Sequence, residues 1–591
     1  MVSAAHRCWP SFKRTPRMFT QTWQTSAREY EMTIERDVSI PVGGGVCMKA
    51  DIYRPKAPGR FPVILAASPY SKEIQAMPMM PVGFSYARGW MESGDPNFYV
   101  RRGYVMAIAT IRGARGSGGT FGNIEPDPQT VRDLAEAIEW LGQQDWSTGK
   151  VGMNGVSYFS LIAKRVAMLK PASLAALFSP YGFTDGYRDV LYRGGILAAE
   201  FMEYWLRRQA PFFNIENTLR KQWGDEKYHA AVQAALRDPE IANSPALANA
   251  LRNPDAGGHP VLVEILVNPL FNDYWKERVV DFDKGCDVPA YLGGDWGMFG
   301  LHLPGDLRAW AHWKGPKRLT LGPPIYLDRP AYQYAYESLR WFDHWLKGLD
   351  TGMMDEPPVQ VFIEGTGQWR TSTQWPLPET RWTPFYLHRD GLLSEHEFWP
   401  NEGWSNYEDS MFARHGVEFW SPPMVETTEL CGPSVLNLWG STTDTDVLWF
   451  VSLLHRDAQG VERVLTRGWL RGTQRKLDIA RSKPWLPVHT HDERQPLRPN
   501  EVYEFNIEVQ SIGIELKPGE RIGLRIKGCD NEVPATINED IGSGAVARPM
   551  VSIVSVHHNE NCPSHLLLPV TRGNRVGTFI SGGKLPSFAK S

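Results

Sequence analysis

Cysteine is scarce in this chain, and long apolar runs are missing altogether. The six cysteines are spread over 591 residues without a C-x-x-C pair, which favours free thiols in a reducing compartment over a disulfide framework. No apolar run reaches the roughly 18 residues that a membrane-spanning helix needs. The H-E-x-x-H motif and spaced Cys/His sets are also absent, so we expect no metal and no cofactor. We interpret the chain as cytoplasmic, without a membrane partner.

A strong charge of either sign is absent too. The 63 basic and 66 acidic side chains leave a formal net charge of −3, which argues against nucleic acid as the main partner. A homo-oligomer is compatible with this composition. Acidic residues are missing locally from residues 1–28, where several Arg and Lys occur without the apolar core of a secretory signal. We therefore predict that residues 1–29 are a disordered or targeting-like extension.

A short strand, a tight turn and a helix surround Ser157. Residues 150–153 are apolar enough for a strand, and residues 161–168 have helical spacing and good helix formers. Between them, Gly155-Val156-Ser157 suits the sharp turn of a nucleophile elbow, which lifts a serine hydroxyl above the sheet. Phe159 stands where the G-x-S-x-G pattern has its last glycine. On this stretch alone, a catalytic serine and a plain βα turn fit equally well.

The residues on either side of this turn alternate between strands and helices. Continuous apolar segments predict buried strands, and amphipathic segments predict helices. The strands are expected at residues 61–67, 104–110, 174–178, 288–294 and 318–322, and the helices at residues 131–141 and 336–346. Such alternation indicates a parallel sheet with crossover helices, and hence an α/β core.

Two further regions follow different patterns. Residues 181–285 predict helices rich in aromatic side chains, the first at residues 195–208, and we interpret them as a cap over the elbow. Residues 348–358 form a linker by composition. Beyond it, short strands separated by turn residues, beginning at residues 359–364, predict an all-β sandwich or jelly roll.

Several short motifs together resemble the CocE/NonD hydrolases, the family of cocaine esterase, X-prolyl dipeptidyl peptidases and α-amino-acid ester hydrolases. The resemblance covers residues 32–569. Its motifs come from both halves of the chain: Pro69-Tyr70-Ser71-Lys72, Arg112-Gly113, Gly155-Val156-Ser157-Tyr158, Trp341-Phe342-Asp343-His344-Trp345-Leu346-Lys347-Gly348, Asp444-Thr445-Asp446 and Pro496-Leu497-Arg498-Pro499. The family pattern G-x-S-Y-x-G has its second glycine where this chain has Ser160.

The resemblance implies an α/β-hydrolase core (residues 30–180 and 286–350), a helical cap (181–285) and a C-terminal β jelly-roll domain (351–591). It also implies that Ser157 is acylated, and that the Tyr70 hydroxyl and the Tyr158 backbone N–H form an oxyanion hole. Elementary chemistry supports these two donors, because a tetrahedral intermediate is stabilised by hydrogen bonds aimed at the developing negative charge.

The usual partners of such a serine are missing from their expected places. A serine hydroxyl needs a base to take its proton and an acid to orient that base. The family's acid lies in a G-W-x-D segment, where this chain reads Gly293-Gly294-Asp295-Trp296-Gly297-Met298. Aligning on the tryptophan puts Met298 at the acid position, and aligning on the glycines puts Gly297 there. The family's histidine follows G-P-W-x, where this chain has Tyr326.

Three ionisable residues remain on these loops: Asp295, His302 and Asp328. In one arrangement His302 is the base and Asp328 its orienting carboxylate, and in another His302 pairs with Asp295. A structural role for His302 is a third alternative. Two functions therefore stand: a serine hydrolase of small-molecule esters or amides with rebuilt partners, or a hydrolase-like scaffold that has lost this chemistry. The retained elbow, Tyr70 and cap favour the first, and the aromatic cap suggests an apolar or aromatic acyl group.

Overall fold

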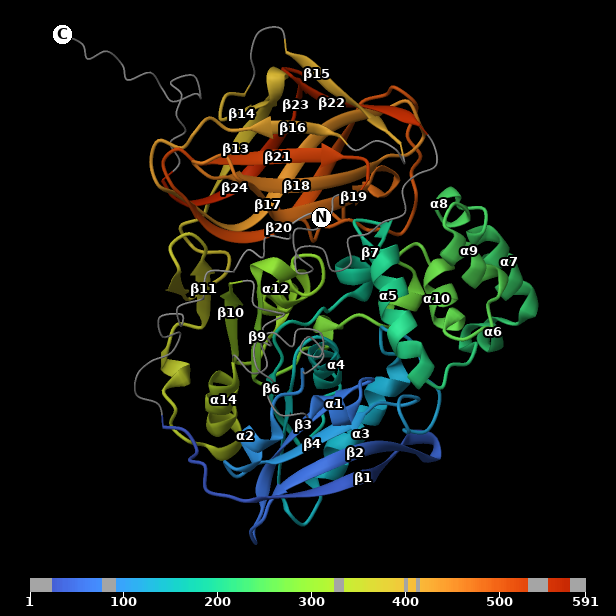
Figure 1. Cartoon of the computed structure of the whole chain (residues 1–591), viewed down its shortest axis with the longest axis vertical. Coiled ribbons are helices and arrows are strands. Elements are labelled where there is room, and N and C mark those ends of the chain that lie inside the picture. Colours follow the sequence, from blue (N-terminus) through green and yellow to red (C-terminus); the bar gives the residue numbers. More distant parts are fainter. Residues whose placement is uncertain are drawn as a thin grey trace, which may run out of the picture.

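A computed structural model describes residues 24–76, 92–323, 334–397, 402–410, 415–529 and 551–573. Tyr326 and Asp328 lie outside these ranges, as do residues 1–23 of the predicted N-terminal extension. Figure 1 shows three regions: an α/β part up to residue 372, a helical lobe at its side (residues 199–276), and a β part above them (residues 381–573).

Ten strands of the described chain form the sheet of the α/β part, in the order β1-β2-β4-β3-β5-β6-β9-β10-β11-β12. The strands from β4 to β11 in this order are parallel, and the edge pairs β1–β2 and β11–β12 are antiparallel. Their bounds are β1 Met32–Val42, β2 Val46–Pro55, β3 Phe61–Ser68, β4 Val105–Thr110, β5 Ser147–Asn154, β6 Leu174–Phe178, β9 Ala290–Asp295, β10 Lys317–Gly322, β11 Val359–Ile363 and β12 Gln368–Ser372. The parallel α/β core predicted from the alternation is therefore present.

Capping residues set the start of α3 and the end of α14 in the α/β part. The Asp127 carboxylate accepts from the Gln129 and Thr130 N–H groups and so caps α3 (Pro128–Gly142), whose first residue is a proline. Gly348 ends α14 (Ala335–Lys347) in a left-handed conformation. The other α-helices described in this part are α1 Lys72–Gln75, α2 Pro96–Val100, α4 Tyr158–Ala167 and α12 Leu303–His312.

The strand expected at residues 359–364 does not belong to the β part. It is β11, which pairs in parallel with β10 through Leu319, Thr320 and Leu321. All five of its residues are buried, as suits a strand covered on both faces. Composition marks residues 348–358 as a linker, but the sheet continues beyond it because β11 and β12 add two more strands to its edge.

The helical lobe begins later than the sequence predicted. Tyr192–Arg193 (β7) and Ile196–Leu197 (β8) form a small hairpin whose two turn residues, Gly194 and Gly195, both have positive φ. The prediction of a helix from residue 195 is therefore wrong at its start, because a Gly-Gly pair favours a tight hairpin turn. The helices of the lobe follow as α5 Ala199–Gln209, α6 Thr218–Trp223, α7 Asp225–Ala235, α8 Pro239–Ala242, α9 Pro245–Arg252, α10 His259–Leu266 and α11 Asp273–Lys276.

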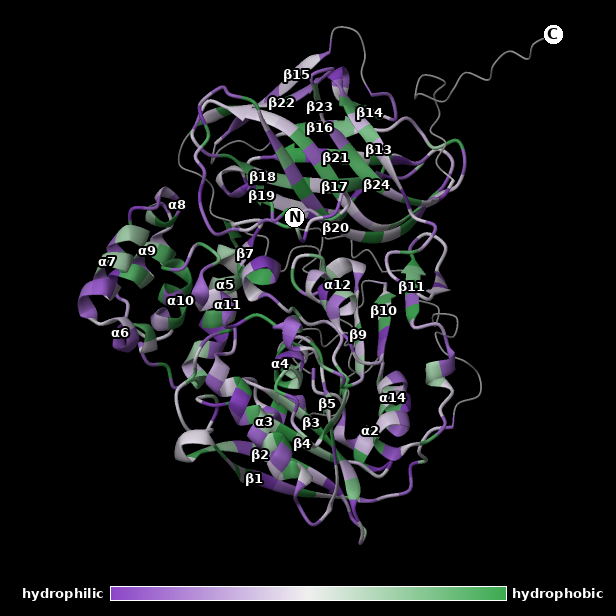
Figure 2. Cartoon of the chain, turned by 180° about the vertical axis from the view of Figure 1, so that it is seen from behind, coloured by the Kyte–Doolittle hydropathy of each residue, from purple (hydrophilic) through white to green (hydrophobic). Residues whose placement is uncertain are grey.

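The β part is a closed ring of strands with its own hydrophobic core. Among the described residues, nine strands pair in the circular order β17-β20-β19-β18-β21-β16-β14-β13-β24, because β24 also pairs with β17. Figure 2 shows hydrophobic residues recurring along these strands, and side chains such as Leu436, Trp449 and Phe505 fill the core. The bounds are β13 Arg381–His388, β14 Leu392–Ser394, β15 Gly403–Asp409, β16 Val417–Trp420, β17 Thr428–Thr442, β18 Leu448–Arg456, β19 Glu462–Arg471, β20 Tyr503–Leu516, β21 Arg521–Lys527, β22 Ser552–Asn559, β23 Cys562–Pro563 and β24 His565–Arg572.

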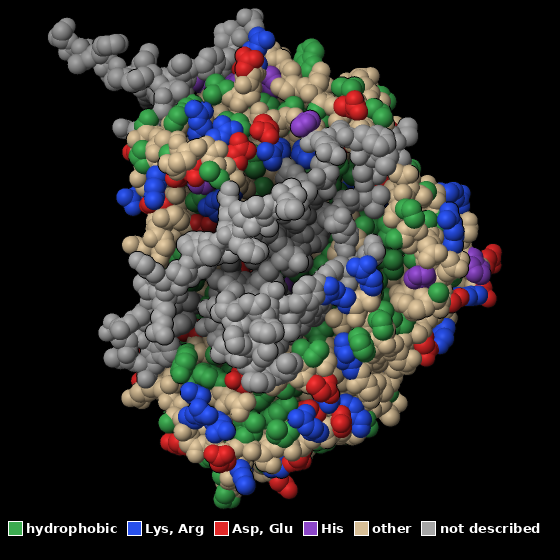
Figure 3. Space-filling model, viewed as in Figure 1, with side chains coloured by type: hydrophobic (Ala, Val, Ile, Leu, Met, Phe, Trp, Pro, Cys, Tyr) green, Lys and Arg blue, Asp and Glu red, His purple; other side chains and the backbone are tan. Residues whose placement is uncertain are grey.

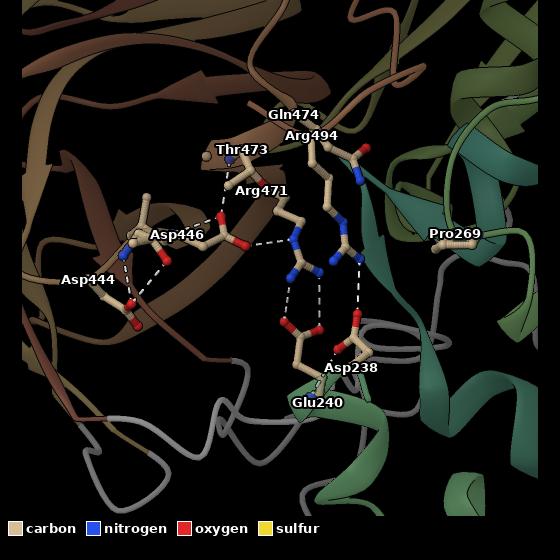
Figure 4. A network of polar contacts seen from close by, with 12 residues as sticks. Asp238, Glu240, Pro269, Asp444, Asp446, Arg471, Thr473, Gln474 and Arg494 are labelled. Atoms are coloured by element: carbon tan, nitrogen blue, oxygen red, sulfur yellow. Dashed lines mark hydrogen bonds and ion pairs between the residues drawn. The ribbon is translucent and has the colours of Figure 1, made fainter. Parts of the chain in front are cut away.

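Charged side chains tie the helical lobe to the β part. Arg471, the last residue of β19, is buried, and its Nη2 lies 2.8 Å from Oε1 of Glu240 in α8. Its Nε lies 2.8 Å from Oδ2 of Asp446, whose other oxygen accepts from the Thr473 N–H. Arg494 reaches Asp238 at 3.1 Å beside this pair (Figure 4). We call these residues the Arg471 network.

The described face in Figure 3 carries basic and acidic side chains interspersed with apolar ones. This mixture agrees with the near-neutral net charge of the sequence. Among the described residues, the helices include none with the length and apolarity required to cross a membrane.

Candidate active site around Ser157

Ser157 occupies a strained turn between β5 and α4. Its φ of 58° and ψ of −122° are unusual for a residue with a side chain. The backbone holds this geometry, because the Ser157 N–H donates to the Tyr181 carbonyl at 2.8 Å. Gly155, with a φ of +141°, permits the turn, since a Cβ there would lie 2.5 Å from the Phe159 Cβ. The strand–turn–helix expected around Ser157 is thus present.

His302 lies beside the Ser157 hydroxyl. Its Nε2 is 3.2 Å from Ser157 Oγ, within the range that proton transfer requires. His302 immediately precedes α12, and its N–H donates to the Met298 carbonyl at 3.1 Å. The imidazole is buried and meets the Tyr181 ring edge to face, with centroids 6.4 Å apart. The sequence named His302 among several alternatives, and the fold brings it to the serine.

The surroundings keep His302 uncharged. Burial lowers the pKa of His302 to about 3, and the Lys164 ammonium adds to the same effect. A neutral imidazole has an acceptor nitrogen, so at neutral pH His302 is in the form that can take a proton from Ser157.

Of the two candidate acids, the structure describes only Asp295. Asp295 ends β9, is buried, and accepts from the Gly297 N–H at 2.9 Å. It lies by Tyr181, whose pKa is raised foremost by burial and also by the charge of Asp295. Met298 packs its side chain in the core and contributes its carbonyl to His302. Since Asp328 lies outside the described residues, the choice between Asp295 and Asp328 as orienting acid stays a prediction.

Tyr70 also lies within hydrogen-bonding reach of Ser157. It follows β3, is nearly buried, and its hydroxyl accepts from the Trp205 indole N–H at 3.3 Å. Burial raises the pKa of Tyr70 well above its usual value, the Glu92 charge raises it further, and hydrogen bonds with Trp205 and Ser157 oppose the rise. The phenol therefore stays protonated at neutral pH. Because Trp205 donates to its oxygen, the Tyr70 hydrogen is available to another acceptor.

Tyr158 supplies the second expected donor from its backbone. It is the first residue of α4, and the first N–H groups of a helix have no partner within that helix. Its buried side chain packs edge to face on Tyr70, with ring centroids 6.1 Å apart. The Tyr158 N–H, which belongs to the residue after Ser157, and the Tyr70 hydroxyl therefore stay the predicted pair of oxyanion donors.

A buried ion pair behind the site was not anticipated. Lys164 of α4 lies 3.0 Å from Asp306 Oδ1 of α12, and both side chains are buried. Lys164 also donates to Ser160 Oγ at 2.7 Å and to the Ser179 carbonyl at 2.8 Å. The only signal in the sequence is the pair Lys164-Arg165 within a largely apolar stretch of helix. Ser160, a glycine in the resembled family pattern, here contributes a hydroxyl to this cluster.

Asp306 fixes the helix that carries His302. It follows His302 by one helical turn, and its N–H donates to the His302 carbonyl at 3.3 Å. Its carboxylate accepts from the Gly182 N–H at 2.6 Å and the Gly293 N–H at 3.4 Å. Burial raises the pKa of Asp306 to about 6, against the opposing effect of Lys164, so the carboxylate is mostly ionised at neutral pH. The pair therefore links the serine helix to the histidine helix.

Comparison with known proteins extends over both the α/β part and the β part. Residues 44–325 match the sequence profile of X-Pro dipeptidyl-peptidase (S15 family). Residues 351–567 match the profile of the X-Pro dipeptidyl-peptidase C-terminal non-catalytic domain. Cocaine esterase from Rhodococcus sp. is 23% identical over 603 residues, which cover 91% of this chain and 99% of that protein.

Solved structures share the fold over nearly the whole length. A CocE/NonD family hydrolase from Staphylococcus aureus is 24% identical with a TM-score of 0.75, and the match covers 92% of this chain and 94% of that one. An aminopeptidase from a marine sediment archaeon of the Thaumarchaeota is 17% identical with a TM-score of 0.73, covering 95% of this chain and all of that one (100%).

Proposed function

This chain belongs to the CocE/NonD family of hydrolases, and from that premise we propose that it cleaves an ester or amide bond of a small molecule through an acyl-enzyme on Ser157. The observation that carries the proposal is the 3.2 Å contact between His302 Nε2 and Ser157 Oγ. A hydrolase-like scaffold without this chemistry would have no need of a neutral imidazole held against a strained serine.

In the proposed reaction His302 takes the proton of Ser157 as Oγ attacks the substrate carbonyl carbon. The carbonyl oxygen gains negative charge and accepts hydrogen bonds from the Tyr70 hydroxyl and the Tyr158 N–H. The C–O or C–N bond then breaks, and His302 returns the proton to the departing alcohol or amine. Water repeats the sequence on the acyl-enzyme, releasing the acid and free Ser157.

The orienting acid belongs to the same proposal. Asp328, six residues beyond the end of β10 in the sequence, is one candidate, and Asp295, at the end of β9, is the other. Either carboxylate would hold the His302 ring and stabilise the imidazolium that forms during attack. Tyr326 and Met298, which stand at the family's histidine and acid positions, have no proton-transfer role in this scheme.

We further propose that the three regions serve as domains of one enzyme. The helical lobe would act as a cap whose aromatic side chains favour an apolar or aromatic acyl group. The closed ring of strands would be a jelly roll, set on the α/β core rather than taking part in the chemistry. Residues 1–29 stay predicted as a disordered or targeting-like extension only up to residue 23, because Ser26 donates to the Asp343 carboxylate and the Glu29 N–H to the Arg101 carbonyl.

A fluorophosphonate tests the acyl-enzyme directly, because it labels only an activated serine. Intact-mass spectrometry should show one adduct on the natural chain and none on Ser157→Ala. Ser160→Ala is a matched control, since its hydroxyl lies three residues away and faces the Lys164 cluster. An adduct that persists in Ser157→Ala, or that is absent from the natural chain, would overturn the proposal.

A further inference from the structure

A cavity of about 370 Å³ adjoins the oxyanion side of the candidate site. Its lining includes Tyr70, Gln75, Arg115 and Arg208, and the lining residues that the structure describes include no Asp or Glu. Its volume falls in the range of small-molecule binding sites. Tyr70 is common to both places: its ring lines the cavity and its hydroxyl hydrogen-bonds with Ser157. A ligand group in the cavity and a carbonyl at Ser157 can therefore belong to one molecule.

Arg115 is held rigidly at the wall of this cavity. It lies in the loop after β4 with a positive φ of 44°. Its Nε donates to the Pro69 carbonyl at 3.2 Å, and its Nη2 donates to Gln209 Oε1 at 3.0 Å. The guanidinium carbon lies 3.9 Å from the centroid of the Phe212 ring. These neutral contacts orient the cation, and N–H groups remain for a ligand because a guanidinium has five.

The charge of Arg115 is not paired with a carboxylate among the side chains that the structure describes. The ion pairs found within the described ranges include none at Arg115. The charge of Glu73 acts on the pKa of Arg115, but the Glu73 carboxylate already accepts hydrogen bonds from Lys72 Nζ at 2.7 Å and Ser71 Oγ at 2.6 Å. Partial burial lowers the pKa of Arg115, as expected for a cation without a counter-ion.

A second cation, Arg208 of α5, lines the same cavity. A half-buried cation such as Arg115 is costly unless an anion meets it, and a guanidinium matches a carboxylate in shape and hydrogen-bonding geometry. We propose that this cavity binds a carboxylate carried by the substrate, with Arg115 as the residue that selects it. The inference rests on the proposed hydrolase function, and it narrows the substrates to esters or amides with an anionic end.

Matched ester pairs test the selection. In the acyl arm, the p-nitrophenyl half-ester of glutarate is compared with p-nitrophenyl pentanoate. In the leaving-group arm, the butyrate ester of 4-hydroxybenzoate is compared with that of 4-hydroxybenzamide. In one arm the natural chain should prefer the anionic member, and Arg115→Gln should lower the ratio of the two kcat/KM values by about 10-fold to 100-fold, the usual worth of a charged hydrogen bond. Raised salt should lower the ratio in the same direction.

Arg102→Gln is the control for loss of an arginine as such. Arg102 lies 4.2 Å from the Phe98 ring centroid and donates to the Phe98 carbonyl at 2.8 Å, so it resembles Arg115 but lies outside the cavity lining. This variant should leave the ratio unchanged. Arg115→Lys, which keeps a positive charge, should retain part of the preference, and it serves if Arg115→Gln does not fold.

Two outcomes would overturn the inference. One is a natural chain without preference in either arm, and the other is an Arg115→Gln variant with an unaltered ratio. Fluorophosphonate labelling of Ser157 separates these results from failure of the proposed function. A labelled protein that cleaves neutral esters but ignores the carboxylate would keep the hydrolase assignment and lose only the carboxylate site.

Discussion

The two sides of the Ser157 hydroxyl are built in opposite ways. On the histidine side, charge is compensated inside the protein, because Lys164 and Asp306 form a buried pair behind an uncharged His302. On the tyrosine side, Tyr70 and Trp205 form a neutral hydrogen-bonded pair, and Arg115 beyond them has no carboxylate partner among the described residues. We therefore propose that the histidine side serves proton transfer and that the tyrosine side binds negative charge of the substrate.

The largest effects should come from the contact between Ser157 and His302. Ser157→Ala and His302→Ala should each lower kcat by roughly 10⁶-fold, because a nucleophile and its base act as a unit. The double variant should be no worse than either single one. Initial rates with an activated ester measure this. A His302→Ala enzyme with near-normal activity would remove the histidine from the mechanism, and Tyr326→Phe would then show whether that tyrosine serves instead.

Replacing the orienting acid should cost less than replacing the base. If Asp328 holds His302, Asp328→Asn should lower kcat by roughly 10⁴-fold, as when a triad carboxylate is lost. Asp295→Asn should then have a much smaller effect, and the reverse ranking would identify Asp295. Each variant serves as the control for the other, since each removes one carboxylate charge from a candidate acid. Equal, small losses would exclude both.

On the tyrosine side, Tyr70→Phe should lower kcat by roughly 10²-fold to 10³-fold with little change in KM, since one oxyanion donor is lost. Trp205→Phe should have a smaller effect in the same direction, because it removes only the N–H that orients the Tyr70 hydroxyl. Steady-state kinetics with a neutral ester separate kcat from KM. A raised KM at unchanged kcat in Tyr70→Phe would mean that the phenol only binds substrate.

The smallest effect should be a displaced pH profile. An ordinary histidine base would make kcat/KM rise near its usual pKa of about 6.5, but a His302 pKa of about 3 moves that rise well into the acid range. Lys164→Met removes the cation that disfavours imidazolium, so the rise should shift to higher pH. Arg318→Met, which breaks a largely buried pair with Glu356 elsewhere, should destabilise the fold without shifting the profile. A rise near 6.5 in the natural chain would contradict the buried, neutral His302.

The free energy of unfolding should also depend on pH, because His302 has different pKa values in the folded and unfolded chain. The folded chain keeps His302 neutral down to about pH 3, whereas the unfolded chain protonates it below roughly pH 6.5. The unfolded state therefore binds more protons between these values, so the contribution of His302 to the free energy of unfolding falls as the pH drops through that window. Lys164→Met also leaves the buried Asp306 carboxylate without its cation, which costs about 3–5 kcal/mol.

The sequence was informative where one local pattern was enough. The elbow at Ser157, the strand before Tyr70 and most strands of the sheet follow from apolar spacing and turn residues. His302 could only be one candidate, because its distance from Ser157 depends on how α12 docks across 145 residues of intervening chain. The pairs Lys164–Asp306 and Trp205–Tyr70 join residues 142 and 135 apart, so no periodicity could reveal them. The β7–β8 hairpin, by contrast, could have been predicted from its Gly194-Gly195 turn, where we expected a helix to begin.

The Arg471 network gives the protein a constraint on how it can be divided. Glu240 belongs to the helical lobe, but the guanidinium that neutralises it is contributed by the β part. Cutting the chain after residue 372 would take the guanidinium away from Glu240 and expose both partners of this buried ion pair to water. In protein engineering, the helical lobe and the ring of strands should therefore be exchanged together. A lobe taken alone from a relative would need an arginine in the ring of strands that matches its carboxylate.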